Sequence, residues 1–375
     1  MSFTLAAVEA YAFRVPITNP IKVAFGTFRD RPMVLVRVVD VDGAEGWGEA
    51  WCNWPAVGAE HRARLAADLG ERLIGRTFSG PGEMFQTLSR DLEVLVLQTG
   101  EVGPSAQAVA GLDIAAWDLV ARQERRPLYS MLGREHVATV PVYATGINPD
   151  NPEDYALARR AEGHRAFKLK TGFGLELDAR NIAAMRKALG PDATIMMDAN
   201  QSLDFDGAIA LAKATAHCNL SWYEEPMRID VPAGQWEALA KASPIPLAGG
   251  ENLRGDDLVA ATKGRVLRVI QPDATKWGGI SGNIDVARTA VAEGKRFCPH
   301  VFGGGLALLS ALHLLAAAGG DGTLEFDSHP NAGRELIVGD RVPVQDGCVP
   351  VPQGPGLGAV PNLAALKRYR TWPAV

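Results

Sequence analysis

The chain has 375 residues, a formal net charge of −5, and 47% hydrophobic and 22% charged residues. This length exceeds the usual size of one hydrophobic core, so two domains are expected, one of them a large α/β barrel. Lysines and arginines are spread along the chain, which argues against nucleic acid or an anionic membrane as a partner. The four cysteines form no CxxC pair, so neither a disulfide framework nor a zinc site is indicated.

The N-terminal segment has no basic start followed by an apolar core, so we expect no signal peptide. The longest apolar stretch, Leu306 to Ala318, contains Ser310 and His313 and is too short to span a bilayer. Its pattern is that of a buried helix. These features favour a cytoplasmic protein.

The first part of the chain has the pattern of an α+β domain, which we place at residues 1–130. Residues 3–15 and 33–39 are strand-like, and an Asp42-Gly43 turn precedes a GWGEA segment. A helical pattern follows, and its longest segment, 107–123, has one broad apolar face.

Residues 131–340 alternate between short apolar runs and helical segments, which predicts a (β/α) barrel of the TIM type. A doubly wound open sheet is the alternative, but no GxGxxG follows a strand. The tail, 341–375, lacks this rhythm, and we expect it to return to the first domain. The eight runs are VPVYATG (140–146), AFKLK (166–170), TIMMDAN (194–200), LSWYEEP (220–226), PLAGGEN (246–252), VIQPD (269–273), RFCPH (296–300) and TLEFD (323–327).

Ionisable side chains stand at the ends of these runs, where the catalytic groups of such barrels lie. A single acid at a strand end is usually a helix cap or part of a loop ion pair. Seven strand ends in register on one rim indicate an active site. The residues concerned are Lys168, Lys170, Asp198, Glu224, Glu251, Asp273, His300 and Glu325.

Three of the acids, Asp198, Glu224 and Glu251, end consecutive strands. Converging carboxylates repel one another, so a bound cation is expected, and hard oxygen ligands suit Mg²⁺. We do not expect Glu225 to be a ligand, because neighbouring strand residues point to opposite faces.

The two lysines, Lys168 and Lys170, point to the same side of their strand. Two adjacent buried ammonium groups lower each other's pKa, so Lys170 is a candidate general base. Solvated surface lysines are the alternative, but Phe167 and Leu169 mark this run as barrel wall.

Asp273 and His300 end adjacent strands, where the carboxylate would orient the imidazole and raise its basicity. The barrel would place His300 across the mouth from Lys170, with the metal between them. His329 follows the last strand and is a further candidate for the mouth.

These segments, in this order, resemble the mandelate racemase/muconate lactonizing enzyme family of the enolase superfamily. The GWGEA segment and the LDIAAWDL helix at 112–119 are part of the resemblance. It implies a (β/α)7β barrel capped by an α+β domain that the N-terminus and the C-terminal tail build together. The resemblance also implies Mg²⁺ on the three acids, acid–base roles for Lys170 and the His300–Asp273 pair, and a protonated Glu325 that donates a hydrogen bond to the substrate carboxylate.

Within this family, four segments look most like acid-sugar dehydratases and sugar-lactone cycloisomerases. The segments are YATG, KLKTGFG, PHVFGGG and EFDSHPN. Loops 19–29 and 51–57 of the capping domain would choose the substrate. The expected substrate-binding residues are Phe25, Trp51, Trp54, Asn200 and His329.

The predicted reaction removes the proton next to a substrate carboxylate and gives an enediolate. Expulsion of a β-leaving group would make the enzyme a dehydratase or cycloisomerase, and reprotonation from the other face a racemase or epimerase. A non-catalytic carboxylate-binding barrel is the alternative from another class. The expected partner is a small carboxylate, and we expect a homo-oligomer.

Overall fold

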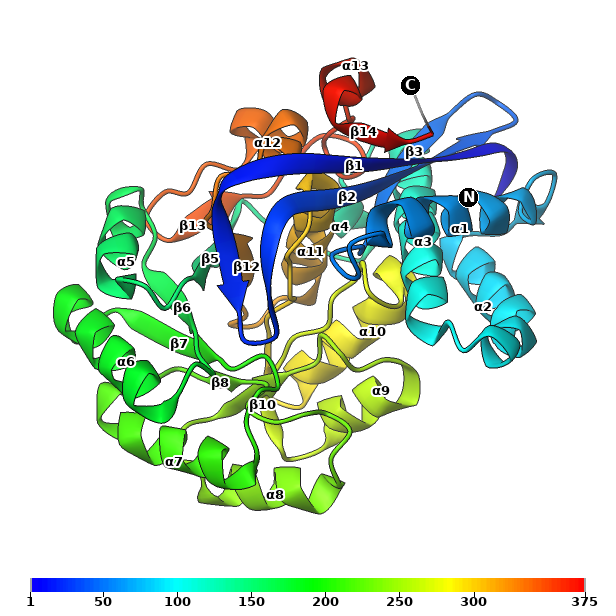
Figure 1. Cartoon of the computed structure of the whole chain (residues 1–375). Coiled ribbons are helices and arrows are strands. Elements are labelled where there is room, and N and C mark those ends of the chain that lie inside the picture. The colour runs from blue at the N-terminus through cyan, green and yellow to red at the C-terminus, as the bar shows by residue number, and fades with distance from the viewer. Residues whose placement is uncertain (1, 374–375) are drawn as a thin grey trace.

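The computed structural model describes residues 2–373, which form a capping domain and a barrel (Figure 1). The capping sheet is antiparallel, in the order β14-β1-β2-β3, with β4 beside β1. Its elements are β1 (Phe3–Val23), β2 (Gly26–Asp40), β3 (Glu45–Ala50), α1 (Gly58–Glu71), β4 (Thr77–Phe78), α2 (Pro81–Thr99), α3 (Val102–Gln123) and α4 (Leu128–Met131).

Helix α3 packs against β3, and glycines allow the close approach. A Cβ atom at Gly48 would lie 2.1 Å from the carbonyl oxygen of Gly111, and one at Gly46 would lie 2.1 Å from that of Ala115. The GWGEA segment therefore places Trp47 and Glu49 on a strand that lies directly on the helix.

The second domain is a curled parallel sheet of eight strands, in the order β11-β10-β9-β8-β7-β6-β5-β12. Its strands are β5 (Thr139–Ile147), β6 (Ala166–Lys170), β7 (Thr194–Asp198), β8 (Tyr223–Glu224), β9 (Leu247–Gly249), β10 (Leu267–Ile270), β11 (Arg296–Phe297) and β12 (Leu324–Asp327). Every predicted run overlaps one of them, and the predicted barrel with its capping domain is confirmed.

Seven helices alternate with these strands in the described part of the chain, which gives the (β/α)7β arrangement. They are α5 (Pro152–Ala161), α6 (Leu175–Leu189), α7 (Phe205–Thr215), α8 (Ala233–Ala242), α9 (Gly255–Lys263), α10 (Gly279–Ala292) and α11 (Gly305–Ala318). Short 3-10 turns lie at Ala216–Cys218, Gly339–Arg341 and Lys367–Tyr369. Side chains alternate along each strand: Met197 packs outward among the helix-facing residues, and Met196 points into the barrel against Trp222.

The tail contacts both domains. After α12 (Ala332–Val338), β13 (Cys348–Pro350) pairs antiparallel with β5 of the barrel. After α13 (Leu363–Leu366), β14 (Arg370–Trp372) pairs with β1, so the tail does return to the capping sheet.

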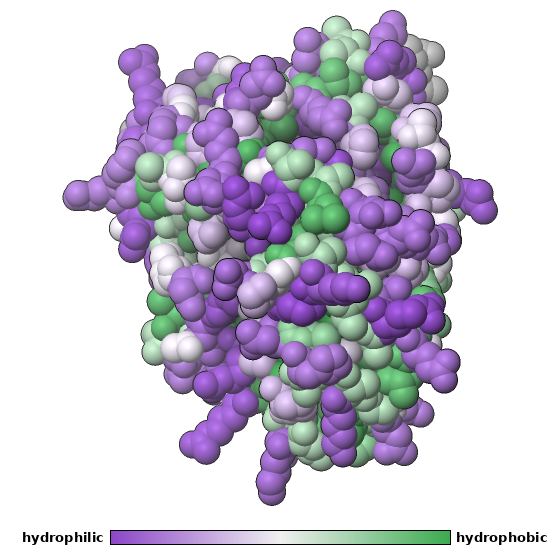
Figure 2. Space-filling view, turned by 90° about the vertical axis from the view of Figure 1, so that its left-hand side faces the viewer, coloured by the Kyte–Doolittle hydropathy of each residue, from purple (hydrophilic) through white to green (hydrophobic). Residues whose placement is uncertain are grey.

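The outer helices present a mostly hydrophilic face with small apolar areas between charged side chains (Figure 2). No helix in residues 2–373 is long and apolar enough to cross a membrane. The predicted buried helix at 306–318 is α11, which is buried along nearly its whole length between the strands and α10.

A buried ion pair joins the two domains. Arg31 on β2 donates to Asp327 at the end of β12 over 2.6 Å, and both side chains are buried. Burial would raise the pKa of Asp327, but Arg31, together with His329 and Arg334, lowers it. We expect Asp327→Asn to destabilise the protein by about 3–5 kcal/mol, because Arg31 stays buried without its counter-charge.

Urea denaturation checks this expectation. The matched control is Asp150→Asn, since Asp150 pairs with Lys22 across the same two domains but in water. An exposed pair contributes no more than about 1 kcal/mol. Equal losses in the two variants would contradict the importance of the buried pair.

Candidate active site

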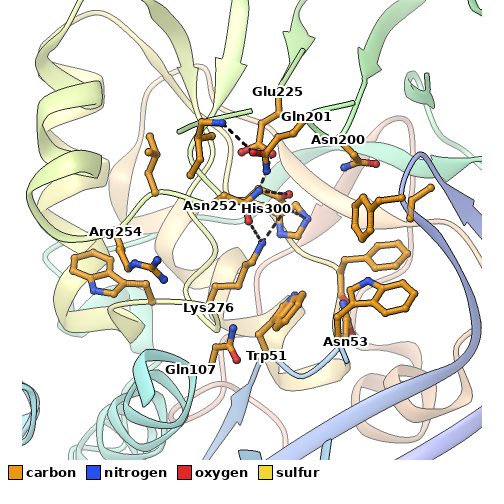
Figure 3. A pocket seen from close by; sticks show the side chains of 18 of the residues that line it. Trp51, Asn53, Gln107, Asn200, Gln201, Glu225, Asn252, Arg254, Lys276 and His300 are labelled. Atoms are coloured by element: carbon orange, nitrogen blue, oxygen red, sulfur yellow. Dashed lines mark hydrogen bonds and ion pairs between the residues drawn. The ribbon is translucent and has the colours of Figure 1, made fainter. Parts of the chain in front are cut away.

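A pocket of about 690 Å³ lies at the barrel mouth (Figure 3). The turn between β1 and β2 reaches over the barrel (Figure 1) and contributes Val23 and Phe25 to the lining. The capping domain contributes aromatic and amide side chains, and the barrel contributes the charged ones. The pocket is lined by Val23, Phe25, Phe28, Trp51, Asn53, Trp54, Pro55, Gln107, Lys170, Asn200, Gln201, Glu225, Ile229, Glu251, Asn252, Leu253, Arg254, Lys276, Trp277, His300 and Phe302.

Lys168 lies below the pocket floor, fully buried. Its Nζ donates to both oxygens of Glu224 over 2.7 Å and lies 2.9 Å from Glu325 Oε1. Burial opposes the charge, but Glu224 and Glu325 outweigh burial and raise the pKa of Lys168 well above its usual value. Lys168 is therefore a fixed cation inside the barrel.

Lys170 lines the pocket and contacts Asp198, with 2.5 Å between Nζ and Oδ2. Burial and the neighbouring Lys168 lower the pKa of Lys170, but Asp198, Glu224 and Glu325 together raise it above its usual value. The expectation that the two lysines have lowered pKa values is wrong for this structure, because each lysine faces its own carboxylate.

His300 stands on the opposite side of the pocket. Its Nδ1 lies 2.7 Å from Asp273 Oδ2, and its Nε2 lies 2.5 Å from Glu251 Oε2. Thr275 donates its hydroxyl, over 2.6 Å, and its backbone N–H to the other Asp273 oxygen. Burial would lower the pKa of His300, but Glu251 and Glu325 raise it well above its usual value. The expected Asp273–His300 contact is present.

The two adjacent acids Glu224 and Glu225 take unexpected places. Glu224 lies inside the barrel, where Gln271 Nε2 donates to it over 2.6 Å. Glu225 lines the pocket, and Asn252 donates to its Oε2 over 2.7 Å. Strand β8 ends at Glu224, and Glu225 has a φ of +36°, so the alternation rule no longer applies there. Sequence reasoning missed Glu225 for this reason.

The oxygen donors fit a hard cation such as Mg²⁺. Buried Glu225 Oε1 and Asn200 Oδ1 have no hydrogen-bond partner, and burial together with Glu251 raises the pKa of Glu225 well above its usual value. Carboxylates crowded in this way are stabilised by a divalent ion. Within residues 2–373, no group of three His, Cys, Asp or Glu side chains has the geometry of a metal-binding site. The cationic partners of Asp198, Glu224 and Glu251 are Lys170, Lys168 and His300.

Glu325 faces a cation and a backbone donor. Its Oε2 accepts a hydrogen bond from the backbone N–H of Val301 over 3.1 Å, and its Oε1 faces Lys168. Burial would raise the pKa of Glu325, but Lys168 and His300 lower it to about 2. These neighbouring cations, which the sequence does not reveal, favour the ionised form of Glu325 over the protonated form that the resemblance implies.

Four of the five expected substrate-binding residues line the pocket: Phe25, Trp51, Trp54 and Asn200. Trp54 lies between aromatic neighbours, with its ring centroid 4.8 Å from Phe28 and 5.9 Å from Phe25.

His329 does not line this pocket. It is 5% exposed, its ring lies 5.2 Å from Tyr155, and its backbone N–H donates to Asp327. Sequence reasoning missed Gln201, Asn252, Arg254 and Lys276, of which Asn252 ends the PLAGGEN run already singled out.

The comparisons with known proteins agree with this architecture. Residues 7–133 match the mandelate racemase/muconate lactonizing enzyme N-terminal domain, and residues 153–365 match the enolase C-terminal domain-like family. The chain therefore belongs to the mandelate racemase/muconate lactonizing enzyme family of the enolase superfamily.

Individual relatives cover almost the whole chain. D-galactarolactone cycloisomerase of Agrobacterium fabrum is 34% identical, over 98% of each chain. A crystal structure of a mandelate racemase/muconate lactonizing enzyme from Bordetella bronchiseptica is 46% identical, with a TM-score of 0.93 over 98% of this chain and 100% of that one. A racemase from Streptomyces coelicolor with bound magnesium is 28% identical, with a TM-score of 0.86 over 98% and 100%.

The relatives are named as cycloisomerases, dehydratases and racemases, so this chain is an enzyme of the superfamily. The alternative of a non-catalytic barrel is set aside.

Proposed function

We propose that this enzyme removes the α-proton of an acid-sugar carboxylate with the help of Mg²⁺ and then expels a β-leaving group. The observation that carries the proposal is the placement of Lys170 and His300. They face one pocket from β6 and β11, and the acids of β7, β8 and β9 come from the strands between them. A substrate carboxylate at those acids would have a proton-transfer group on either side.

We assign the cation to Asp198, Glu224 and Glu251, with Glu225 and Asn200 beside it. When bound, Mg²⁺ supplies positive charge that stabilises the carboxylate oxygens as the α-proton leaves. Lys168, a fixed cation below the pocket, adds to the same field.

The chain's own residues move the protons. Asp198 and Glu251 contact Lys170 and His300 and favour their protonated forms. This effect on the two pKa values becomes weaker once the two acids bind a metal. One of the two groups then takes the α-proton, and the other delivers a proton to the departing β-oxygen. Asp273 keeps the His300 ring oriented throughout.

The substrate class follows from the lining. Tryptophan and phenylalanine rings cover the mouth, and amide side chains offer hydrogen bonds to hydroxyl groups. The relatives named for galactarolactone and arabinonate support an acid sugar or its lactone. We also propose that the substrate is a small carboxylate, that the enzyme is a homo-oligomer and that it is cytoplasmic.

A racemase or epimerase is the second candidate. The observation in its favour is that the two proton-transfer groups face the pocket from both sides, which protonation of either face of an enediolate requires. The relatives include named racemases and epimerases.

A product screen tests the proposal. Aldonic acids, aldaric acids and their lactones are incubated with the enzyme and Mg²⁺, and products are identified by NMR. Elimination is expected to give a 2-keto-3-deoxy acid from a hydroxy acid, or an opened ring from a lactone. Formation of epimers alone would establish the second candidate, and no reaction across the library would contradict the proposed substrate class.

Lys276 leads to a prediction about the second carboxylate of an aldaric acid. Its Nζ donates to Asn252 over 2.8 Å and lies 3.7 Å from Glu251, while Arg254 lines the pocket nearby (Figure 3). Lys276→Met is expected to lower kcat/KM for an aldaric acid by about 10-fold more than for the aldonic acid of the same configuration. The reason is that a hydrogen bond to a charged group contributes about 1.5–3 kcal/mol.

Steady-state kinetics on both acids checks this prediction, with the monoacid as the internal control. Equal losses on both substrates would show that Lys276 does not bind the second carboxylate.

A further inference from the structure

Capping-domain groups hold the chain segments that carry Asp273 and His300. The segment after His300 runs through a glycine turn into α11. Here Glu49, at 2% exposure on β3, accepts hydrogen bonds from the backbone N–H groups of Gly304, over 2.5 Å, and Ala307, over 2.9 Å. Asn53 also donates to the carbonyl of Phe302 over 2.7 Å.

The segment after Asp273 has the same construction. It runs through a second glycine turn into α10, where fully buried Asp113 of α3 accepts from the N–H groups of Ile280, over 2.7 Å, and Ser281, over 3.0 Å. The backbone N–H of Trp51 donates to the carbonyl of Thr275, two residues after Asp273, over 3.0 Å.

The glycines make room for both carboxylates. A Cβ atom at Gly304 would lie 3.0 Å from the Glu49 oxygens, and one at Gly279 would lie 2.2 Å from Asp113 Oδ2. Burial raises the pKa values of Glu49 and Asp113 to about 7, because water is excluded from both contacts. A carboxylate at a helix N-terminus is also stabilised by the helix dipole.

We propose that Glu49 and Asp113 are positioning residues that fix the two halves of the Asp273–His300 pair relative to each other. Glu49 connects the segment after His300 to the β3–α3 unit of the capping domain, and Asp113 connects the segment after Asp273 to the same unit. The position of the capping domain on the barrel therefore sets the contact between the His300 imidazole and the Asp273 carboxylate. The inference rests on the proposed function only for its effect on rate. The contact itself is independent of any substrate.

The test compares Glu49→Gln, Glu49→Ala and Asp113→Asn with Asp118→Asn as the matched control. Asp118 is an equally buried acid of α3, but it accepts from Trp47, Arg122 and Leu357, away from both segments. The first readout is proton NMR of the substrate-free protein. The His300 Nδ1 proton is identified as the downfield signal that His300→Asn removes.

We expect that signal to shift or broaden in the Glu49 and Asp113 variants and to stay in Asp118→Asn. Glu49→Gln keeps one acceptor and the side-chain shape, so its change should be smaller than that of Glu49→Ala. The second readout is turnover of D-galactarolactone. Loss of an outer partner costs about 10- to 100-fold, and this loss is expected in kcat with little change in KM.

An unchanged signal in Glu49→Gln and Asp113→Asn, with kcat no lower than in Asp118→Asn, overturns the inference. If the wild type turned over no acid sugar, the proposed function would fail, and the NMR comparison would still decide the positioning roles.

Discussion

Lys170→Ala and His300→Asn are each expected to lower turnover by about 10²- to 10⁴-fold, the range for loss of a general acid or base. The two variants should differ in what they retain. In a dehydratase or cycloisomerase one group takes the α-proton and the other serves the leaving group. One variant should then lose exchange of the α-hydrogen with D₂O, while the other retains exchange but forms little product.

Proton NMR in D₂O measures exchange and product together. Complementary exchange, in which each variant exchanges only one epimer, would indicate a racemase. Wild-type rates in both variants would remove Lys170 and His300 from the mechanism. Asp273→Asn should weaken only the His300 step, because the imidazole loses its orienting carboxylate.

Glu251→Gln is expected to weaken Mg²⁺ binding and to lower activity by about 10³-fold, since the cation contributes several kcal/mol to the transition state. Glu251 lines the pocket beside Glu225, and His300 and Lys276 are its cationic neighbours. Removing one negative charge lowers the affinity of the acid cluster for a divalent ion.

Calorimetric titration of Mg²⁺ into the variants measures the affinity directly. Glu224→Gln and Glu225→Gln complete the series, because the structure leaves Glu225 facing the pocket and Glu224 facing Lys168. Because Glu224 is the assigned ligand, we expect Glu224→Gln to lose more Mg²⁺ affinity than Glu225→Gln. The greater loss in Glu225→Gln would transfer the ligand role to Glu225.

The sequence predicts the barrel well because each buried strand has a recognisable local pattern of residues. Phe167 and Leu169 pack outward on helices, while Lys168 and Lys170 point inward, and this alternation is visible in five letters. The residues at the strand ends are predicted equally well. The Asp273–His300 contact, for example, requires only that two adjacent strands run in the same direction.

What the sequence could not supply depends on contacts between distant segments. The pKa values of Lys168 and Glu325 follow from the charges opposite them, which no spacing reveals. The pocket position of Glu225 follows from one positive φ after a strand of two residues. Arg254 enters the pocket from a loop between β9 and α9, and loops carry no periodic signal.

The proposed chemistry is removal of a substrate α-proton by Lys170 and His300 together with Mg²⁺. The most direct measurement incubates the wild-type enzyme with D-galactarolactone in D₂O and follows deuterium by NMR, with Mg²⁺ and after treatment with EDTA. Deuterium is expected in the product, or at the α-carbon of the substrate, only when Mg²⁺ is present. Full incorporation in the EDTA-treated enzyme, or product formed with the original α-hydrogen still in place, would contradict the proposed chemistry.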